Sequence, residues 1–149
     1  MNLQMDGRKA DNYSSNAQKI RVITEDWVNN NMFCPYCGNK YVSHFENNRP
    51  VADFFCPSCK EEYELKSKGA SISNKINDGA YNTMIERITS INNPNFFFMH
   101  YNKISLQIEN FVMVPKYFFS PDIIEKRKPL AETARRAGWT GCNILLNRI

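Results

Sequence analysis

The sequence lacks any hydrophobic run long enough to cross a membrane. No stretch approaches the roughly 20 apolar residues that a transmembrane helix needs. The first residues, MNLQMDGRKADNYSSN, contain no apolar segment followed by a small-residue cleavage site. Internal repeats and low-complexity linkers are also absent. We therefore expect a globular protein of the reducing cytoplasm, with no membrane partner.

The length and composition fit one ordinary domain. The chain has 149 residues, of which 42% are hydrophobic and 13% aromatic. A chain of this length buries roughly 68 to 70% of the surface that its unfolded form exposes, so it needs no disulfides to build a core. We expect a single domain that spans residues 1–149.

The net charge of +4 is unevenly distributed along the chain. Residues 1–114 contain 12 basic and 12 acidic side chains, whereas residues 115–149 contain seven basic and three acidic ones. A cluster of positive charge can contact phosphates, although such a cluster more often forms only a solvated face. The last quarter of the chain is therefore a candidate nucleic-acid surface.

Four of the five cysteines form two closely spaced pairs. Cys34 and Cys37 lie in CPYC, Cys56 and Cys59 lie in CPSC, and 18 residues separate the pairs. This spacing is typical of a tetrahedral zinc site, in which two short knuckles each present two thiolates. Because four thiolates leave no position open for water, such a zinc ion would be structural. Cys142 lies far from this set, and we expect it to be a small buried residue.

The main alternative for the cysteines is redox chemistry. CPYC is also the dithiol of a glutaredoxin-type oxidoreductase, but that site needs a strand before the motif and a helix after it. Here an amphipathic helix is expected before the motif, so zinc is favoured. His44 lies between the pairs, and because four cysteines already complete a site, we expect a structural or surface role for it.

Hydrophobic periodicity predicts an α/β fold with a mixed sheet. Residues 16–31 have the apolar stripe of an amphipathic helix, and residues 73–91 predict a second helix despite Gly79. Four strands are expected, and a short helix is expected after Pro121. The strands are predicted at 49–56, 61–68, 96–101 and 104–115. The second cysteine pair would lie at the tip of the hairpin formed by the first two, and the apolar run at 96–98 favours a buried strand over base stacking.

Three charged residues flank the second cysteine pair. Side chains alternate along a strand, so Glu64 and Lys66 point to the same face, and Asp53 on the other strand can lie opposite them. Mg²⁺ is usually held by one or two carboxylates with phosphate oxygens and water. A nearby lysine can orient or deprotonate an attacking water. The set suits phosphodiester hydrolysis, although a solvated hairpin edge would contain similar residues.

The pattern D-x10-E-x-K, preceded by Pro50, resembles the PD-(D/E)xK nuclease signature. The stretches HFENNRPVADFFCPSCKEEYELKSK, INDGAY, NNPNFFF and RKPLAETARRAGWTGCNI resemble the catalytic domain of the DpnI-type family of methyladenine-dependent restriction endonucleases. The likeness extends from about residue 14 to residue 144.

The resemblance implies a PD-(D/E)xK restriction-endonuclease-like fold, a mixed sheet flanked by helices, with an inserted four-cysteine zinc knuckle over residues 34–59. It implies a type II, Mg²⁺-dependent endonuclease that cuts adenine-methylated double-stranded DNA at G-methyladenine-T-C sites. Asp53, Glu64 and Lys66 would be catalytic. Mg²⁺ would be bound by Asp53, Glu64 and the backbone carbonyl of Leu65, and zinc by the four paired cysteines. We also expect a monomer that needs no nucleotide cofactor.

Candidate DNA contacts lie mainly in the basic last quarter: Lys126, Arg127, Arg135, Arg136 and Trp139. Trp139 could contact the adenine methyl group in the major groove, with packing in the core as the alternative. Asn48 and Arg49 are further candidates, with turn formation as the alternative.

The family continues into a winged-helix DNA-binding domain, which is absent from the sequence up to Ile149. We expect a fragment, a truncated gene or a self-sufficient single-domain nuclease. Two other functions remain open: a zinc-knuckle module that binds DNA without cutting it, and an inactive nuclease fragment.

Overall fold

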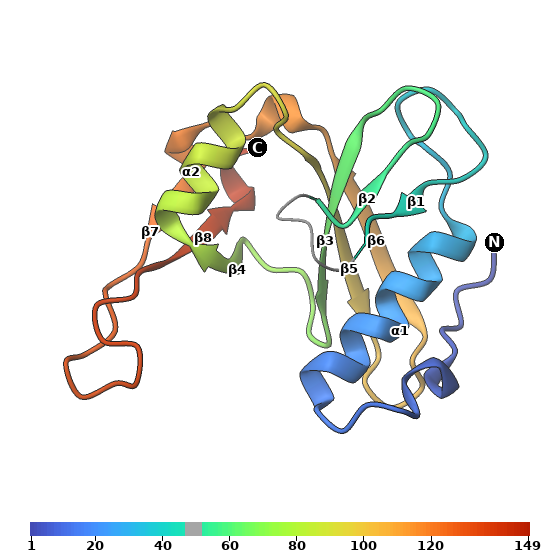
Figure 1. Cartoon of the computed structure of the whole chain (residues 1–149), viewed down its shortest axis with the longest axis horizontal. Helices are drawn as coiled ribbons and strands as arrows, with labels where there is room; N and C mark the ends of the chain where they lie inside the picture. Colours follow the sequence, from blue (N-terminus) through green and yellow to red (C-terminus); the bar gives the residue numbers. More distant parts are fainter. Residues whose placement is uncertain (47–51) are drawn as a thin grey trace. The chain divides into compact units, whose positions relative to one another are not determined.

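The chain forms two compact units, each built from two segments. The computed structural model describes residues 1–46 and 52–149. Unit 1 comprises Met1–Ser71 and Pro94–Val114, and unit 2 comprises Ile72–Asn93 and Pro115–Ile149. Each unit has its own sheet (Figure 1). That both units act as one endonuclease domain stays a prediction.

Unit 1 is built on a mixed five-stranded sheet with the order β1-β2-β3-β5-β6. Strand β3 pairs with β5 in parallel, whereas the other neighbouring strands pair antiparallel. The mixed sheet is therefore as predicted. The strands are β1 (Ser43–His44), β2 (Phe54–Phe55), β3 (Glu62–Lys68), β5 (Asn95–Tyr101) and β6 (Ile108–Val114).

Helix α1 (Asn16–Asn31) has the predicted bounds and packs on this sheet (Figure 1). The Ser15 hydroxyl caps it by accepting the N–H of Gln18, and a short 3-10 helix, Gly7–Ala10, precedes it. The apolar stripe of α1 enters the same buried cluster as residues from β2, β3, β5 and β6. Trp27, for example, lies in that cluster with 3% of its surface exposed.

The three phenylalanines of β5 are part of the core. Phe96 and Phe97 are fully buried and Phe98 is 1% exposed. Phe97 joins the cluster under α1, whereas Phe96 and Phe98 stack on each other with 5.8 Å between ring centroids. A strand buried on both faces produces such a continuous apolar run. The interpretation of this run as core is confirmed.

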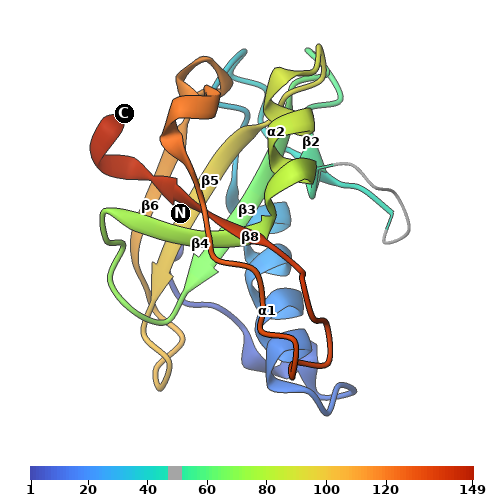
Figure 2. The same ribbon diagram turned by 90° about the vertical axis from the view of Figure 1, so that its left-hand side faces the viewer.

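Unit 2 contains a three-stranded antiparallel sheet and one α-helix (Figure 2). The strand order is β4-β8-β7, and α2 (Tyr81–Thr89) follows β4 directly. The strands are β4 (Lys75–Ala80), β7 (Ile124–Lys126) and β8 (Gly141–Leu145). Three short 3-10 helices complete the unit: Lys116–Phe118, Pro121–Ile123 and Leu146–Arg148.

The predicted helix over 73–91 is wrong in its first part. Residues Lys75–Ala80 form β4, and the helix begins only at Tyr81. Ile76 is buried because it pairs with Ile144 on β8, a strand that we did not predict. Helical spacing alone could not reveal a partner nearly 70 residues away. Ile91, the last residue of the predicted helix, lies beyond the observed one and is 95% exposed.

The turn between β5 and β6 is longer than predicted. Strand β6 begins at Ile108 and not at residue 104. The side chain of Asn102 accepts the N–H groups of Ile104 and Ser105, which bends the chain into a loop before the strand can start.

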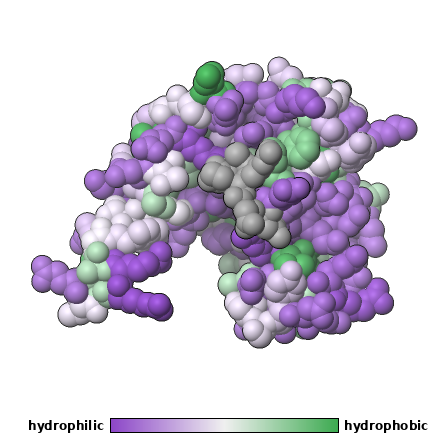
Figure 3. All heavy atoms as spheres, viewed as in Figure 1, coloured by the Kyte–Doolittle hydropathy of each residue, from purple (hydrophilic) through white to green (hydrophobic). Residues whose placement is uncertain are grey.

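No helix in the described ranges, 1–46 and 52–149, is long and apolar enough to span a membrane. On the face drawn in Figure 3, most of the described residues are hydrophilic.

Candidate active site and metal centre

The two cysteine motifs fold into turns of the same design. In the first turn, the N–H of Gly38 donates to the carbonyl of Cys34 at 2.9 Å. In the second turn, the N–H of Lys60 donates to the carbonyl of Cys56 at the same distance. Gly38 and Lys60 both have left-handed backbones, with φ of 77° and 68°. These turns direct both cysteines of each motif to one point.

The four sulfur atoms lie within 4.8 Å of one another and could hold a metal ion. Two short distances join the two motifs, with 3.7 Å between the Sγ atoms of Cys34 and Cys59 and 3.6 Å between those of Cys37 and Cys56. Tetrahedral zinc with Zn–S bonds of about 2.3 Å would separate the sulfurs by roughly 3.8 Å. The donor set and its spacing therefore fit zinc.

The thiols of the second turn differ in acidity. Burial opposes ionisation of Cys56, but backbone N–H groups of Cys59 and Ser58 donate to its sulfur and lower its pKa to about 7. Burial raises the pKa of Cys59 to about 12. A cation at the centre of the cluster would favour the thiolate form at both positions, and binding would release protons.

Asp53, Glu64 and Lys66 come together where β2 meets β3. Phe54 pairs with Tyr63, and continuing this antiparallel register by one residue places Asp53 opposite Glu64. The Asp53 carboxylate accepts the N–H of Leu65 at 2.7 Å. The Lys66 ammonium lies 3.2 Å from the Glu64 carboxylate. The second cysteine turn connects the two strands, so it is the tip of this hairpin.

The electrostatics of this cluster suit a divalent cation. Burial raises the pKa of Asp53, the Leu65 N–H lowers it in part, and the charges of Glu64 and Glu25 raise it further. Ionised carboxylates thus repel one another in a partly desolvated place. A hard cation with oxygen ligands would remove that repulsion, so the residues present fit Mg²⁺.

Glu25 on α1 was not among the predicted site residues. Its carboxylate accepts from Arg21 Nε at 2.7 Å and lies 2.7 Å from His44 Nε2. Its side chain is only 13% exposed, and its charge acts on Asp53. Arg21 and Glu25 are four residues apart on a predicted helix, so the sequence alone indicates an ion pair between them. Only the packing of α1 against β1 and β3 reveals that this pair borders the candidate active site.

His44 also has a clear place in unit 1. Besides its contact with Glu25, its ring meets the edge of the Phe54 ring, with 5.2 Å between centroids. These contacts agree with the structural role that we expected.

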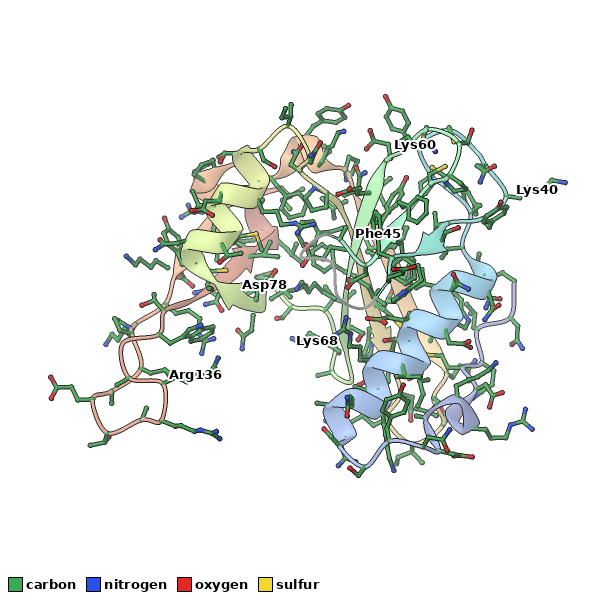
Figure 4. The ribbon with its side chains drawn as sticks, viewed as in Figure 1. Lys40, Phe45, Lys60, Lys68, Asp78 and Arg136 are labelled. Atoms are coloured by element: carbon green, nitrogen blue, oxygen red, sulfur yellow. The ribbon has the colours of Figure 1, made fainter. Side chains whose placement is uncertain are left out.

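Unit 2 carries the basic candidate DNA contacts that the structure describes. Lys126, Arg127, Arg135 and Arg136 are exposed, and Trp139 is half-buried. The guanidinium of Arg136 lies over the indole of Trp139, 4.8 Å from its centroid. Figure 4 shows Arg136 on the long loop between β7 and β8. Asn48 and Arg49 lie outside the described residues.

A comparison with protein-family models matches this sequence over residues 1–149 to the DpnI model, described as the Dam-replacing family. The chain belongs to this family. The match spans both units, so it includes the cysteine turns, the acidic cluster and the basic loop. Membership in the DpnI family indicates a restriction-type nuclease that acts on methylated DNA.

Proposed function

We propose that the protein is a Mg²⁺-dependent type II endonuclease of the PD-(D/E)xK class. Its substrate is adenine-methylated double-stranded DNA, cut at G-methyladenine-T-C sites. The observation that carries this proposal is the convergence of Asp53, Glu64 and Lys66 across the β2–β3 pair. Family membership supports the choice of methylated DNA as substrate.

Each residue of the cluster has a distinct role in this proposal. Asp53, Glu64 and the backbone carbonyl of Leu65 would hold Mg²⁺, which would supply positive charge for the scissile phosphate. The hydrogen bond from the Leu65 N–H fixes the orientation of the Asp53 carboxylate. Lys66 orients the attacking water and helps to remove its proton. Its contact with Glu64 keeps the ammonium beside the carboxylates.

The zinc site has a structural role in this proposal. The four cysteines close the coordination sphere, so zinc takes no direct part in hydrolysis. The second turn joins β2 to β3, so zinc bound at this turn would help to hold Asp53 opposite Glu64.

The basic loop of unit 2 is assigned to DNA contact. Lys126, Arg127, Arg135 and Arg136 are exposed and can reach phosphates, which fixes the protein on DNA without reading sequence. Trp139 is assigned to the adenine methyl group, because apolar side chains read methyl groups in the major groove.

A plasmid assay tests the proposal. The same plasmid, prepared with and without adenine methylation, is incubated with purified protein in the presence and in the absence of added Mg²⁺. Cleavage is expected only of methylated plasmid with Mg²⁺, and not with an Asp53→Asn variant. Binding of methylated DNA without cleavage would favour the non-catalytic module instead. Equal cleavage of both plasmids would reject dependence on the methyl group.

A further inference from the structure

The side chain of Tyr63 connects the cysteine cluster with the strand that carries Glu64. Tyr63 is fully buried on β3, immediately before Glu64. Its ring stacks on that of Phe97, with centroids 4.7 Å apart and ring planes within 5° of each other. Because the ring is held on β3 and against β5, its hydroxyl group has a defined position.

That hydroxyl group lies 3.0 Å from Cys34 Sγ. It also interacts with the backbone N–H of Tyr36, in the turn between Cys34 and Cys37. An amide N–H can only donate, so the phenolic oxygen accepts from Tyr36. The single phenolic hydrogen is then available for the sulfur of Cys34. A thiolate that binds a metal has no hydrogen of its own, so it can only accept the hydrogen bond from Tyr63.

We propose that Tyr63 is an outer member of the zinc site, whose O–H donates to the Cys34 thiolate and increases the affinity for the metal. The inference rests on the zinc site of the proposed function. Groups that hydrogen-bond to metal ligands orient them, and their removal typically lowers metal affinity by about 10- to 100-fold. Because Tyr63 precedes Glu64, this bond also ties the metal site directly to the catalytic strand.

A Tyr63→Phe variant removes the donor and keeps the ring that stacks on Phe97. We expect zinc affinity, measured by competition with a chromophoric chelator, to fall by about 10- to 100-fold. In protein loaded with Co²⁺, the sulfur-to-cobalt absorption band should move to longer wavelength. The reason is that a hydrogen bond stabilises the sulfur electrons, and its loss makes their transfer to the metal easier.

Tyr101→Phe is the matched control. Tyr101 is 8% exposed and belongs to the same core cluster, so the change removes the same atom from the same core. Zinc affinity and the cobalt band should remain at the values of the unchanged protein. Should Tyr63→Phe not fold, 3-fluorotyrosine is incorporated into the unchanged chain. Its more acidic phenol is a stronger donor and should move the cobalt band to shorter wavelength.

Three outcomes would overturn the role of Tyr63. The first is a Tyr63→Phe variant with zinc affinity within twofold of the unchanged protein and the same cobalt band. The second is an equal loss of affinity in Tyr101→Phe, and the third is no band shift with 3-fluorotyrosine. If the unchanged protein binds neither zinc nor cobalt, the zinc site itself is wrong. None of these readouts depends on DNA cleavage, so failure of the nuclease assignment is distinguishable.

Discussion

Lys66 is the residue to which we assign proton transfer in the proposed site. Its ammonium lies 3.2 Å from Glu64, and only 24% of its side chain is exposed. We expect Lys66→Ala to lower the rate of cleavage by about 10²- to 10⁴-fold, the typical contribution of a positioned proton-transfer group. Single-turnover cleavage of methylated plasmid measures this effect.

Lys68 supplies the control for that measurement. It lies two residues further along β3, so it shares the strand, the face and the charge of Lys66. Lys68→Ala should keep cleavage within about tenfold of the unchanged protein, because we assign this residue no part in proton transfer. An equal loss of cleavage in both variants would mean that Lys66 acts only through its positive charge and not through proton transfer.

Asp53 gives a prediction about stability and pH. Its folded-state pKa lies above the ordinary value, chiefly because of burial. Protonated Asp53 therefore contributes stability at acid pH, and this contribution is lost as pH rises through the raised pKa. Asp53→Asn keeps an oxygen that can accept from Leu65 and never ionises. At neutral pH without added Mg²⁺, we expect the variant to melt at a higher temperature than the unchanged protein.

The pH dependence separates this cause from others. As pH falls from neutral through the raised pKa of Asp53, the difference in melting temperature should shrink, because the Asp53 carboxyl becomes neutral like the amide of the variant. Mg²⁺ should raise the melting temperature of the unchanged protein and not that of Asp53→Asn. If Asp53→Asn is less stable than the unchanged protein at neutral pH, the ionised Asp53 carboxylate does not destabilise the fold and the prediction is wrong.

The hairpin of β2 and β3 is the element on which the site depends. Among the described residues its strands pair at two positions, and the cysteine cluster lies at its turn. Structural zinc contributes about 10 to 16 kcal/mol of apparent binding free energy in small finger peptides, against about 5 to 15 kcal/mol for a whole domain. We expect one zinc per chain by elemental analysis. Removal by a strong chelator should unfold the hairpin and abolish cleavage. Folded protein without zinc would contradict this prediction.

The same elements show what the sequence could reveal. The cysteine turns and α1 could be predicted because their signals are local. The cysteine spacing and the apolar stripe of the helix involve only residues that are close in the sequence. The hairpin around Cys56 was also predictable, since its two strands flank one short turn. Strand β4 was missed because its burial depends on Ile144, far along the chain. The proximity of Glu25 to Asp53 was missed for the same reason, since only tertiary packing brings them together.

At the scale of the whole molecule, the proposed catalytic residues and the excess positive charge lie in different units. Unit 1 carries the carboxylates and the cysteine cluster, whereas the basic side chains after residue 115 belong to unit 2. Cleavage and DNA binding should therefore be separable by substitution. Asp53→Asn should still bind methylated DNA, and substitutions in the loop between β7 and β8 should weaken binding without removing the cleavage chemistry.

Arg135 and Trp139 test how that loop contacts DNA. Arg136 is unsuitable for a clean test, because its guanidinium stacks on the Trp139 indole and its loss would disturb both. Arg135 is exposed, and Arg135→Ala should weaken binding of methylated and unmethylated duplexes alike. Loss of one phosphate contact should reduce the slope of log affinity against log salt by about 0.9. Binding titrations without added Mg²⁺, at several salt concentrations, measure both quantities.

The competing roles of Trp139 are distinguished by the same titrations. The indole of Trp139 lies against Gly141, the first residue of β8. A Cβ atom added at Gly141 would lie only 2.9 Å from the indole Cη2 atom. If the indole only supports the loop, Trp139→Ala should weaken both duplexes equally and lower the melting temperature. If Trp139 reads the methyl group, Trp139→Ala should weaken binding of the methylated duplex more than binding of the unmethylated one. We expect the second result, because the indole is only half-buried and retains an apolar surface for the methyl group. Equal weakening of both duplexes would assign methyl recognition to other residues.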